Sequence, residues 1–214
     1  MEALPNPPPQ FETKLNFAHI TKTGGTSIED CARENGIMWG RFFKGLFWWH
    51  DIPNNYDESI KYKYDWFSVV RNPFTRIVSE FNYYNESNVS EFLSFGCIFK
   101  KEDFNRVLCE QIKGKIKWFS KYKRGHHWIP QSEYFKNDIN IKVIKFENLR
   151  QEFESLAKEY NLSIRLDKFS NKSKDRKYKK AKLFSVKDLS EKSIETISSF
   201  YKEDFEMFGY KKEI

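Results

Sequence analysis

Short apolar runs in this chain alternate with longer segments in which apolar side chains recur every three or four residues. The first pattern is typical of buried strands, and the second of helices that bury one face. Strands are predicted at residues 15–20, 66–70 and 140–146, and helices at residues 27–34, from Pro73 onward, and at 92–122, 150–160 and 189–208. Strands that alternate with helices predict a mainly parallel sheet. We therefore expect one three-layer α/β domain with a central sheet over residues 15–214, after a flexible, proline-rich segment at 1–14.

Residues 37–55 follow neither pattern. Aromatic and basic side chains fill this segment, and Gly40, Gly45 and Pro53 interrupt it. We expect a short strand followed by an ordered loop, with most of the aromatic rings in the core rather than on a binding surface.

Length and composition are those of one packed domain: 214 residues, 39% of them hydrophobic, with 21 Phe. An excess of 37 basic over 30 acidic residues gives a net charge of +7, which favours an anionic partner such as a nucleotide, a sulfated sugar or a nucleic acid. No run of about 18 apolar residues occurs, so we expect no signal peptide and no membrane span, and a protein that is cytoplasmic or otherwise soluble. The cysteines, Cys31, Cys97 and Cys109, lack metal-ligand spacing and are expected to be free thiols.

The stretch from Leu15 to Glu29, LNFAHITKTGGTSIE, places a glycine-rich loop between the first predicted strand and the first predicted helix. Paired glycines let the backbone turn its N–H groups toward a ligand, and the start of a helix favours an anion. The loop is therefore predicted to hold a phosphate. In a P-loop the lysine follows the last glycine, as GxxxxGK[ST], whereas Lys22 precedes the glycines here. This order argues against a nucleotide kinase or NTPase, which remains an alternative function.

The string HITKTGGTSIE closely resembles the 5′-phosphosulfate loop of sulfotransferases that use 3′-phosphoadenosine 5′-phosphosulfate (PAPS), particularly the carbohydrate and heparan sulfate type, whose loop reads much like HIPKTGGTS. Thr21 stands where that pattern has proline, which is expected to alter the stiffness of the loop more than its chemistry. The resemblance implies a P-loop-like sulfotransferase fold. It also implies that the donor is bound by Lys22, Thr23, Gly24, Gly25, Thr26 and Ser27, and that Lys22 neutralises charge on the leaving nucleotide.

A second motif follows the strand at 66–70 and reads DWFSVVRNPFTRIVSEFNYY. Arg71 lies at the carboxyl end of this strand, where ligands collect in open α/β sheets. The string resembles the RxPxxRxxSxY-like 3′-phosphate motif of the same superfamily. The resemblance implies that Arg71 and Ser79 hold the 3′-phosphate of PAPS, and that Arg76 braces the loop or the substrate. Ser79 lies eight residues beyond Arg71, so the two share one phosphate only if the chain between them folds back.

His50 is the predicted catalytic base, because it falls between the two motifs, as does the catalytic histidine of the heparan sulfate 2-O- and 6-O-sulfotransferases that this region resembles. An imidazole that titrates near neutrality suits removal of a proton from a hydroxyl. Glu29 is the second candidate and Asp30 a weaker third, since other sulfotransferases use a carboxylate. A solvated or core histidine with no catalytic role is the alternative interpretation of His50.

Two later segments complete the predicted site. The run His126–His127–Trp128–Ile129–Pro130–Gln131 resembles the HWxPQ segment of chondroitin and related sulfotransferases. That resemblance implies that His126, His127, Trp128 and Gln131, together with Trp49, shape the acceptor site, and either histidine is a further candidate for catalysis. The string KFSNKSKDRKY resembles the loop that closes over the nucleotide, which implies that Asn171, Ser173 and Lys174 contact PAPS. The adjacent histidines lack further partners at zinc-ligand spacing, so no metal is expected.

These motifs together predict an enzyme that moves a sulfuryl group from PAPS to an acceptor hydroxyl on a carbohydrate. A basic nucleic-acid-binding module is a further alternative, because residues 172–182 are rich in Lys and Arg. The segment lacks a repeated aromatic platform, so no nucleic-acid partner is expected. The identity of the acceptor and the oligomeric state stay open at this point.

Overall fold

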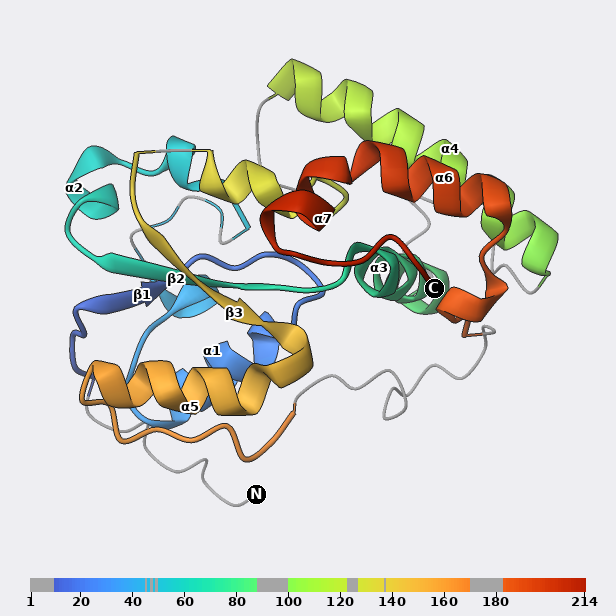
Figure 1. Ribbon diagram of the computed structural model, residues 1–214. Helices are drawn as coiled ribbons and strands as arrows, with labels where there is room; N and C mark the ends of the chain where they lie inside the picture. The colour runs from blue at the N-terminus through green and yellow to red at the C-terminus, as the bar shows by residue number, and fades with distance from the viewer. Residues whose placement is uncertain are drawn as a thin grey trace, which may run out of the picture.

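The computed structural model describes residues 10–44, 46, 48, 50–87, 100–122, 127–136, 138–169 and 183–214 (Figure 1). The first half of the chain contains β1 (Leu15–Phe17), α1 (Gly25–Glu34), the 3-10 helices η1 (Gly40–Phe42) and η2 (Pro53–Asn55), α2 (Glu58–Lys61), β2 (Asp65–Val70) and α3 (Pro73–Ser87). The second half contains α4 (Lys101–Tyr122), η3 (Gln131–Phe135), β3 (Ile141–Lys145), η4 (Phe146–Asn148), α5 (Leu149–Glu159), η6 (Val186–Asp188), α6 (Glu191–Phe200) and α7 (Lys202–Met207).

The described strands form one parallel sheet in the order β1-β2-β3, with β2 in the centre. Asn16 lies beside Trp66, and Trp66 lies beside Ile141. Because the three strands run in the same direction, the segments that follow them leave the sheet at one edge. The loop after β1 and the start of α3 are therefore neighbours.

Each face of the sheet is covered by a different kind of structure. Phe17, Phe67 and Ile144 pack in one core with side chains of α1 and α5, which lie on the same side of the sheet (Figure 1). On the opposite face, Val70 packs with Tyr134 of η3 and with side chains from the other segments on that side, Ile20, Ile52, Ile129 and Phe208. The domain thus has three layers. Helices α1 and α5 form the first, the sheet forms the second, and the short 3-10 turns with the end of α7 form the third, so the predicted α/β fold class is confirmed.

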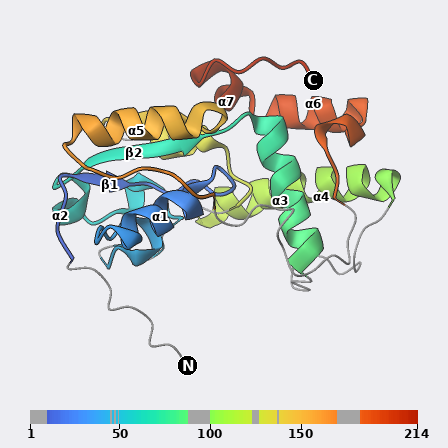
Figure 2. The same cartoon turned by 90° about the horizontal axis from the view of Figure 1, so that it is seen from below.

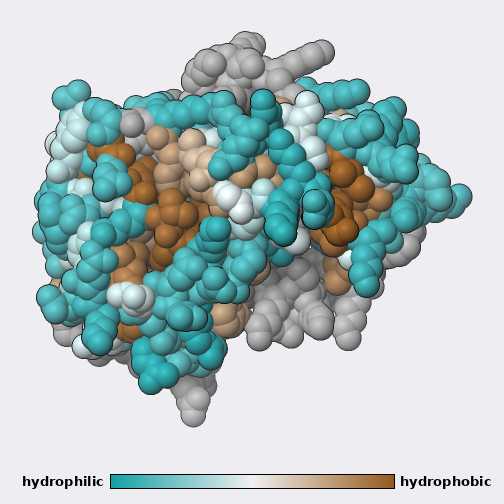
Figure 3. Space-filling model, in the orientation of Figure 1, coloured by the Kyte–Doolittle hydropathy of each residue, from teal (hydrophilic) through white to brown (hydrophobic). Residues whose placement is uncertain are grey.

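A separate group of helices extends beyond the carboxyl end of β2. Helix α3 runs across the direction of β2 and packs with α4, α6 and α7 around a second apolar core (Figures 1 and 2). On the face of the molecule shown in Figure 3, hydrophobic residues gather in limited areas, one of them over the sheet. Val143 of β3 is 43% exposed. None of the described helices combines the length and apolar composition needed to cross a membrane.

Two predicted elements are wrong. The described part of residues 37–55 contains the 3-10 helices η1 and η2 and no strand, because Gly40 adopts a φ of +54°, which breaks an extended backbone, and Pro53 begins η2. The predicted helix at 189–208 is two helices, because the backbone leaves helical geometry at Tyr201 with ψ of 26°. That break brings Asp204 of α7 against the backbone N–H groups of Gln131 and Ser132.

The remaining helices agree with the predictions within one or two residues where the structure describes them. Helix α4 begins at Lys101, and the residues before it in the predicted helix at 92–122 lie mostly outside the described part of the chain. Cys31 and Cys109 are buried, free thiols, and Cys97 lies outside the described residues.

Candidate active site

The loop of residues 22–27, here called the Lys22 loop, joins β1 to α1 and exposes every second residue. Lys22, Gly24 and Thr26 are partly exposed, whereas Thr23, Gly25 and Ser27 are buried. The buried members hold the loop in shape: the Thr23 hydroxyl donates to the carbonyl of Ile20 at 2.7 Å, and the Ser27 N–H donates to the carbonyl of Gly24 at 3.0 Å. The partly exposed members are accessible from solvent at the start of α1, where an anion would be favoured.

The two glycines of this loop are required for different reasons. Gly24 has a φ of +86°, a conformation that side chains disfavour, and an added Cβ there would lie 2.9 Å from Leu149. Gly25 has no such strain, but a Cβ at this position would lie 2.3 Å from Nε2 of His19. The loop therefore lies directly against the His19 ring, with no room for a side chain between them.

Arg71 lies beside the Lys22 loop at the end of β2. Its Nη1 donates to the carbonyl of Lys22 at 3.1 Å, its Nε donates to the hydroxyl of Thr75 at 3.0 Å, and its guanidinium stacks over Phe146 at 4.2 Å. Burial lowers the pKa of the Arg71 guanidinium to about 10. Among the residues that the structure describes, no carboxylate forms an ion pair with it, so Arg71 is a largely buried cation bonded to neutral groups.

Lys22 contacts the face of α3 that also carries Thr75, the partner of Arg71. Its Nζ lies 4.5 Å from the ring centre of Tyr83. Thr75, Ser79 and Tyr83 are spaced by four residues, so they share one face of the helix, and all three are partly exposed. Ser79 therefore lies on α3 between Thr75, which contacts Arg71, and Tyr83, which contacts Lys22. The structure brings together Lys22, Arg71 and Ser79, three residues that the sequence assigns to one nucleotide.

His50 is almost completely buried, at 7% exposed, and lies behind the Lys22 loop. Its Nδ1 is 3.1 Å from the carbonyl oxygen of His19. A carbonyl can only accept, so Nδ1 carries the proton and Nε2 has the lone pair in the neutral ring. Burial holds the pKa of His50 well below its usual value, and the neighbouring rings of His19 and His127 lower it further. His50 is thus a neutral imidazole at pH 7, with the proton on Nδ1 and none on Nε2.

Glu29, the second candidate base, is fully buried in α1. One carboxylate oxygen accepts from Nδ1 of His19 at 2.7 Å and from the backbone N–H of Arg41 at 2.9 Å. The other oxygen lies 3.5 Å from Nε of Arg41. These contacts fix the His19 ring and close the η1 turn over α1, and the catalytic role of Glu29 stays a prediction. Asp30, the weaker third candidate, is in ion-pair contact with the same arginine.

The segment that begins at His127 places its side chains at different depths. The His127 side chain is 26% exposed, and its ring centre lies 5.4 Å from that of His50. Trp128 is buried at 2% and stacks against Tyr84. Gln131 is fully buried, and its amide exchanges hydrogen bonds of 2.8 and 2.9 Å with the backbone of Arg71. Gln131 therefore positions Arg71 in this structure, and its predicted contact with an acceptor remains untested.

Five predicted site residues lie outside the described part of the chain: Trp49, His126, Asn171, Ser173 and Lys174. Within the described part, no group of three His, Cys, Asp or Glu side chains has the arrangement of a metal site.

The sequence did not single out three polar residues that complete the site: His19, Glu80 and Tyr83. His19 carries the carbonyl that holds His50, and Glu80 is a fully buried carboxylate on α3. Arg76, one turn before Glu80, is also fully buried and donates to the carbonyls of His127 and Ile129. Two charged residues four positions apart on the apolar face of a helix were the available signal.

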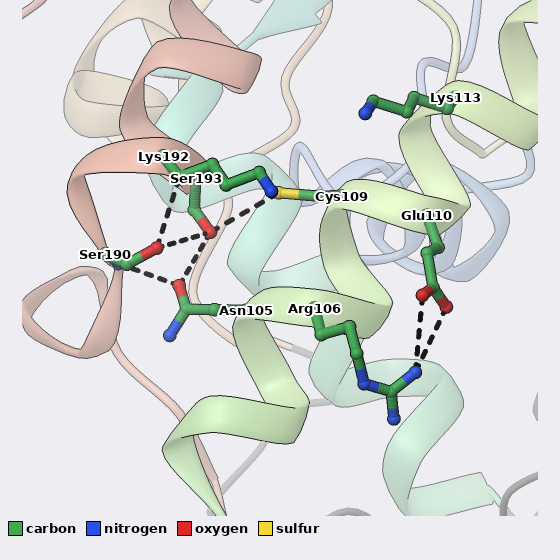
Figure 4. A pocket seen from close by; sticks show the side chains of 8 residues that line it. All are labelled: Asn105, Arg106, Cys109, Glu110, Lys113, Ser190, Lys192 and Ser193. Atoms are coloured by element: carbon green, nitrogen blue, oxygen red, sulfur yellow. Dashed lines mark hydrogen bonds and ion pairs between the residues drawn. The ribbon is translucent and has the colours of Figure 1, made fainter.

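A cavity of about 330 Å³ lies elsewhere, between α4 and α6 (Figure 4). It is lined by Asn105, Arg106, Cys109, Glu110, Lys113, Ser190, Lys192 and Ser193. None of these residues belongs to the two motifs, and the hydroxyl and amide groups of Asn105, Ser190 and Ser193 are hydrogen-bonded to one another. The cavity is therefore separate from the candidate active site.

Comparison with models of protein families matches residues 11–211, almost the whole chain, to the model described as the sulfotransferase family. No curated protein and no solved structure matches the chain in the other two comparisons.

Proposed function

The chain belongs to the sulfotransferase family, and from that premise we propose that it transfers a sulfuryl group from PAPS to a hydroxyl of a carbohydrate acceptor. The observation that carries the proposal is the 3.1 Å hydrogen bond from Arg71 to the carbonyl of Lys22. Through this contact the two cationic motifs meet at the carboxyl edge of the sheet, where one nucleotide is within reach of both.

The residues at this edge fit a nucleotide with phosphates at both ends. The start of α1 presents backbone N–H groups at Gly25 and Thr26, and Lys22 adds a positive charge beside them. Arg71 donates hydrogen bonds to a hydroxyl and a backbone carbonyl, both neutral, so a phosphate beside it would form a charge-assisted contact. In this assignment the Lys22 loop holds the 5′-phosphosulfate, and Arg71 with Ser79 holds the 3′-phosphate.

The donor supplies the sulfuryl group and a nucleoside bisphosphate as leaving group. Lys22 stabilises the negative charge that develops on the oxygen between phosphate and sulfate. Nε2 of His50 takes the proton of the acceptor hydroxyl, because its Nδ1 is already committed to the carbonyl of His19. An in-line displacement further requires that the activated oxygen approach the sulfur from the side opposite the leaving group.

The carbohydrate acceptor is supported by the resemblance of the Lys22 loop and of the segment at 126–131 to carbohydrate-type enzymes. Aromatic side chains near His50 suit a sugar ring, whose C–H face packs on aromatic surfaces. Trp48, two residues before His50, is 44% exposed, and Tyr83 is partly exposed beside His127.

Calorimetric titration with 3′-phosphoadenosine 5′-phosphate and with adenosine 5′-monophosphate tests the assignment of Arg71. Wild-type protein is expected to prefer the first nucleotide, because only this one has a 3′-phosphate. Arg71→Ala is expected to weaken its binding at least tenfold, or about 1.4 kcal/mol, and to leave the binding of the monophosphate within about twofold.

Arg106→Ala is the matched control, since Arg106 is an exposed arginine of α4 that pairs with Asp103 and Glu110. It removes the same charge and is expected to change neither affinity. Equal losses for both nucleotides in Arg71→Ala would contradict the 3′-phosphate assignment. Tighter binding of ATP with Mg²⁺ than of 3′-phosphoadenosine 5′-phosphate would contradict the proposed donor and favour a kinase. Transfer of labelled sulfate to a panel of glycans, phenols and amines identifies the acceptor class.

A further inference from the structure

Glu80 joins three parts of the candidate active site through one buried carboxylate. It is fully buried on α3, and its Oε1 lies 2.6 Å from Nδ1 of His127. Its Oε2 accepts a hydrogen bond of 3.2 Å from the hydroxyl of Thr21, which directly precedes the Lys22 loop. The residue before Glu80 in the chain is Ser79, the predicted contact of the 3′-phosphate. A fully buried carboxylate is costly unless it is compensated, so this position calls for an explanation.

The His127 ring and its backbone carbonyl each contact several neighbouring residues. Besides Glu80, its ring faces His50 edge-on at 5.4 Å between ring centres, stacks on Tyr83 at 5.8 Å and lies 5.5 Å from Tyr84. Its backbone carbonyl accepts from Arg76 at 3.4 Å and lies 3.2 Å from the Thr21 hydroxyl, whose single proton is shared between this carbonyl and Glu80. An ionised carboxylate can only accept, so Nδ1 of His127 carries a proton. The atom of His127 that remains to take up a further proton is Nε2.

His50 and His127 differ in how well each ring tolerates a positive charge. The Nδ1 partner of His50 is a neutral carbonyl, and the ring is 7% exposed between two other imidazoles. The Nδ1 partner of His127 is a carboxylate, and its side chain is 26% exposed. A proton placed on His50 is therefore poorly accommodated, whereas a proton on His127 is paired with Glu80 and within reach of solvent.

We propose that Glu80 is a positioning residue that holds His127 beside His50 and stabilises positive charge on it, so that the proton of the acceptor passes from His50 to His127. This inference rests on the proposed sulfuryl transfer. As the acceptor oxygen bonds to sulfur, the bond between sulfur and the bridging oxygen breaks, and the leaving 5′-phosphate keeps that electron pair. The acceptor proton moves to Nε2 of His50, then to Nε2 of His127 directly or through one water, and from there to solvent.

Thr21 connects this arrangement to donor binding. The sulfotransferase pattern that the loop resembles has proline at this position, which lacks a hydroxyl, whereas the Thr21 hydroxyl reaches both Glu80 and the backbone of His127. A change in the position of the Lys22 loop is therefore transmitted to Glu80 and to the orientation of the His127 ring.

Glu80→Gln removes the charge and can keep every contact. The new carbonyl can accept from His127, the new amide can donate to Thr21, and the Thr21 hydroxyl can donate to the carbonyl of His127, which it already contacts. We expect kcat to fall at least tenfold, while KM for PAPS, affinity for 3′-phosphoadenosine 5′-phosphate and melting temperature stay close to wild type. Glu110→Gln, an exposed position of α4, is the matched control and should change none of these.

A second pair of variants tests the link to the loop. Thr21→Val removes the hydroxyl at nearly constant volume and is expected to lower kcat about threefold, and Thr21→Ser is expected to recover it. A kcat of Glu80→Gln within twofold of wild type overturns the proposal. A loss in kcat that is accompanied by a tenfold loss in nucleotide affinity and a clear fall in melting temperature also overturns the proposal. Such a result would show that Glu80 contributes only to packing.

Nitrogen-15 spectra of histidine-labelled protein give a readout that needs no turnover. The chain has 4 histidines, and His127→Gln identifies the signals of that ring. Wild type should show a proton on Nδ1 of His127, and Glu80→Gln should move the signal of that nitrogen, because its partner has lost its negative charge. An unchanged Nδ1 signal overturns the role of Glu80. If wild type transfers sulfate to no acceptor while the spectra behave as expected, the proposed function fails and the pairing of Glu80 with His127 stands.

Discussion

Two buried polar networks in this protein differ in charge. Around the Lys22 loop, two fully buried carboxylates, Glu29 and Glu80, each hold a histidine. Between α4 and α6, the network consists of neutral groups: the amide of Asn105 bonds to Ser190 and Ser193, and the hydroxyl of Ser193 lies 3.5 Å from the thiol of Cys109 (Figure 4). Both networks join helices, but of the two only the first contains buried carboxylates.

The difference indicates what each network is for. Buried neutral groups that satisfy one another fix the packing of two helices at little cost, whereas buried carboxylates are expensive and persist mainly where chemistry needs them. The cavity between α4 and α6 is lined in part by such hydrogen-bonded neutral groups, and the ion pair on its lining, Arg106 with Glu110, is exposed to solvent. In this molecule the arrangement of charge, rather than the presence of a cavity, marks the candidate active site.

The largest expected effect is on kcat and comes from a substitution in the charged network. His50→Ala should reduce kcat by roughly 100-fold or more, about 2.7 kcal/mol, because the proposed general base is removed. Burial keeps the pKa of His50 well below its usual value, so the ring is already neutral at pH 7 and carries no charge that the nucleotide would need. Affinity for 3′-phosphoadenosine 5′-phosphate, measured by calorimetry, should stay within twofold.

Asn105→Ala is the counterpart in the neutral network and the control for this comparison. Four hydrogen bonds of that side chain are lost, to Lys101, Asp188, Ser190 and Ser193. The free energy of unfolding should fall by about 1–3 kcal/mol, while kcat per folded molecule is unchanged. Normal turnover in His50→Ala would pass the role of the base to Glu29 or His127.

A smaller effect is expected from a methyl group added beside the charged network. In Gly25→Ala the new Cβ would meet Nε2 of His19 at 2.3 Å, and the His19 ring is held from the other side by Glu29. The ring cannot move without breaking that contact, so the free energy of unfolding should fall by about 1–3 kcal/mol in urea denaturation. Nucleotide binding should weaken too, because the Lys22 loop must shift. Unchanged stability would show that the His19 ring is less firmly held than its contacts indicate.

Much of the fold can be predicted from the local pattern of apolar residues, and the errors of that prediction have local causes. The three strands were predicted close to their observed bounds because buried parallel strands read as short apolar runs. The first strand ends earlier than predicted, at Phe17, since Ala18 and Ile20 stay buried in other clusters after the backbone has left the strand. The break at Tyr201 was not predictable from apolar spacing, because residues on both sides of it pack into the same core.

The candidate site could be predicted only in part. That Lys22 and Arg71 approach each other follows from parallel strands, whose carboxyl ends share an edge. The partners of the histidines do not follow, since His127 and Thr21 reach Glu80 across 47 and 59 residues of sequence. Which nitrogen of a histidine carries the proton depends on such long-range contacts. A pattern of apolar positions records burial, but it does not record which buried groups meet.

The smallest expected effect comes from replacing Gly114 of α4 by alanine, the same change as at Gly25 but beside the neutral network. Gly114 lies within α4, is exposed, and an added Cβ would meet no atom within 4 Å. Alanine loses less backbone entropy on folding than glycine and favours a helix, so Gly114→Ala should raise the free energy of unfolding by about 0.5–1 kcal/mol. Turnover should not change. Opposite signs for Gly25→Ala and Gly114→Ala, measured by the same urea denaturation, would show that close packing around the His19 ring decides the outcome, because the chemical change is identical. A destabilised Gly114→Ala would mean that α4 is constrained at this point by contacts other than those of its own helix.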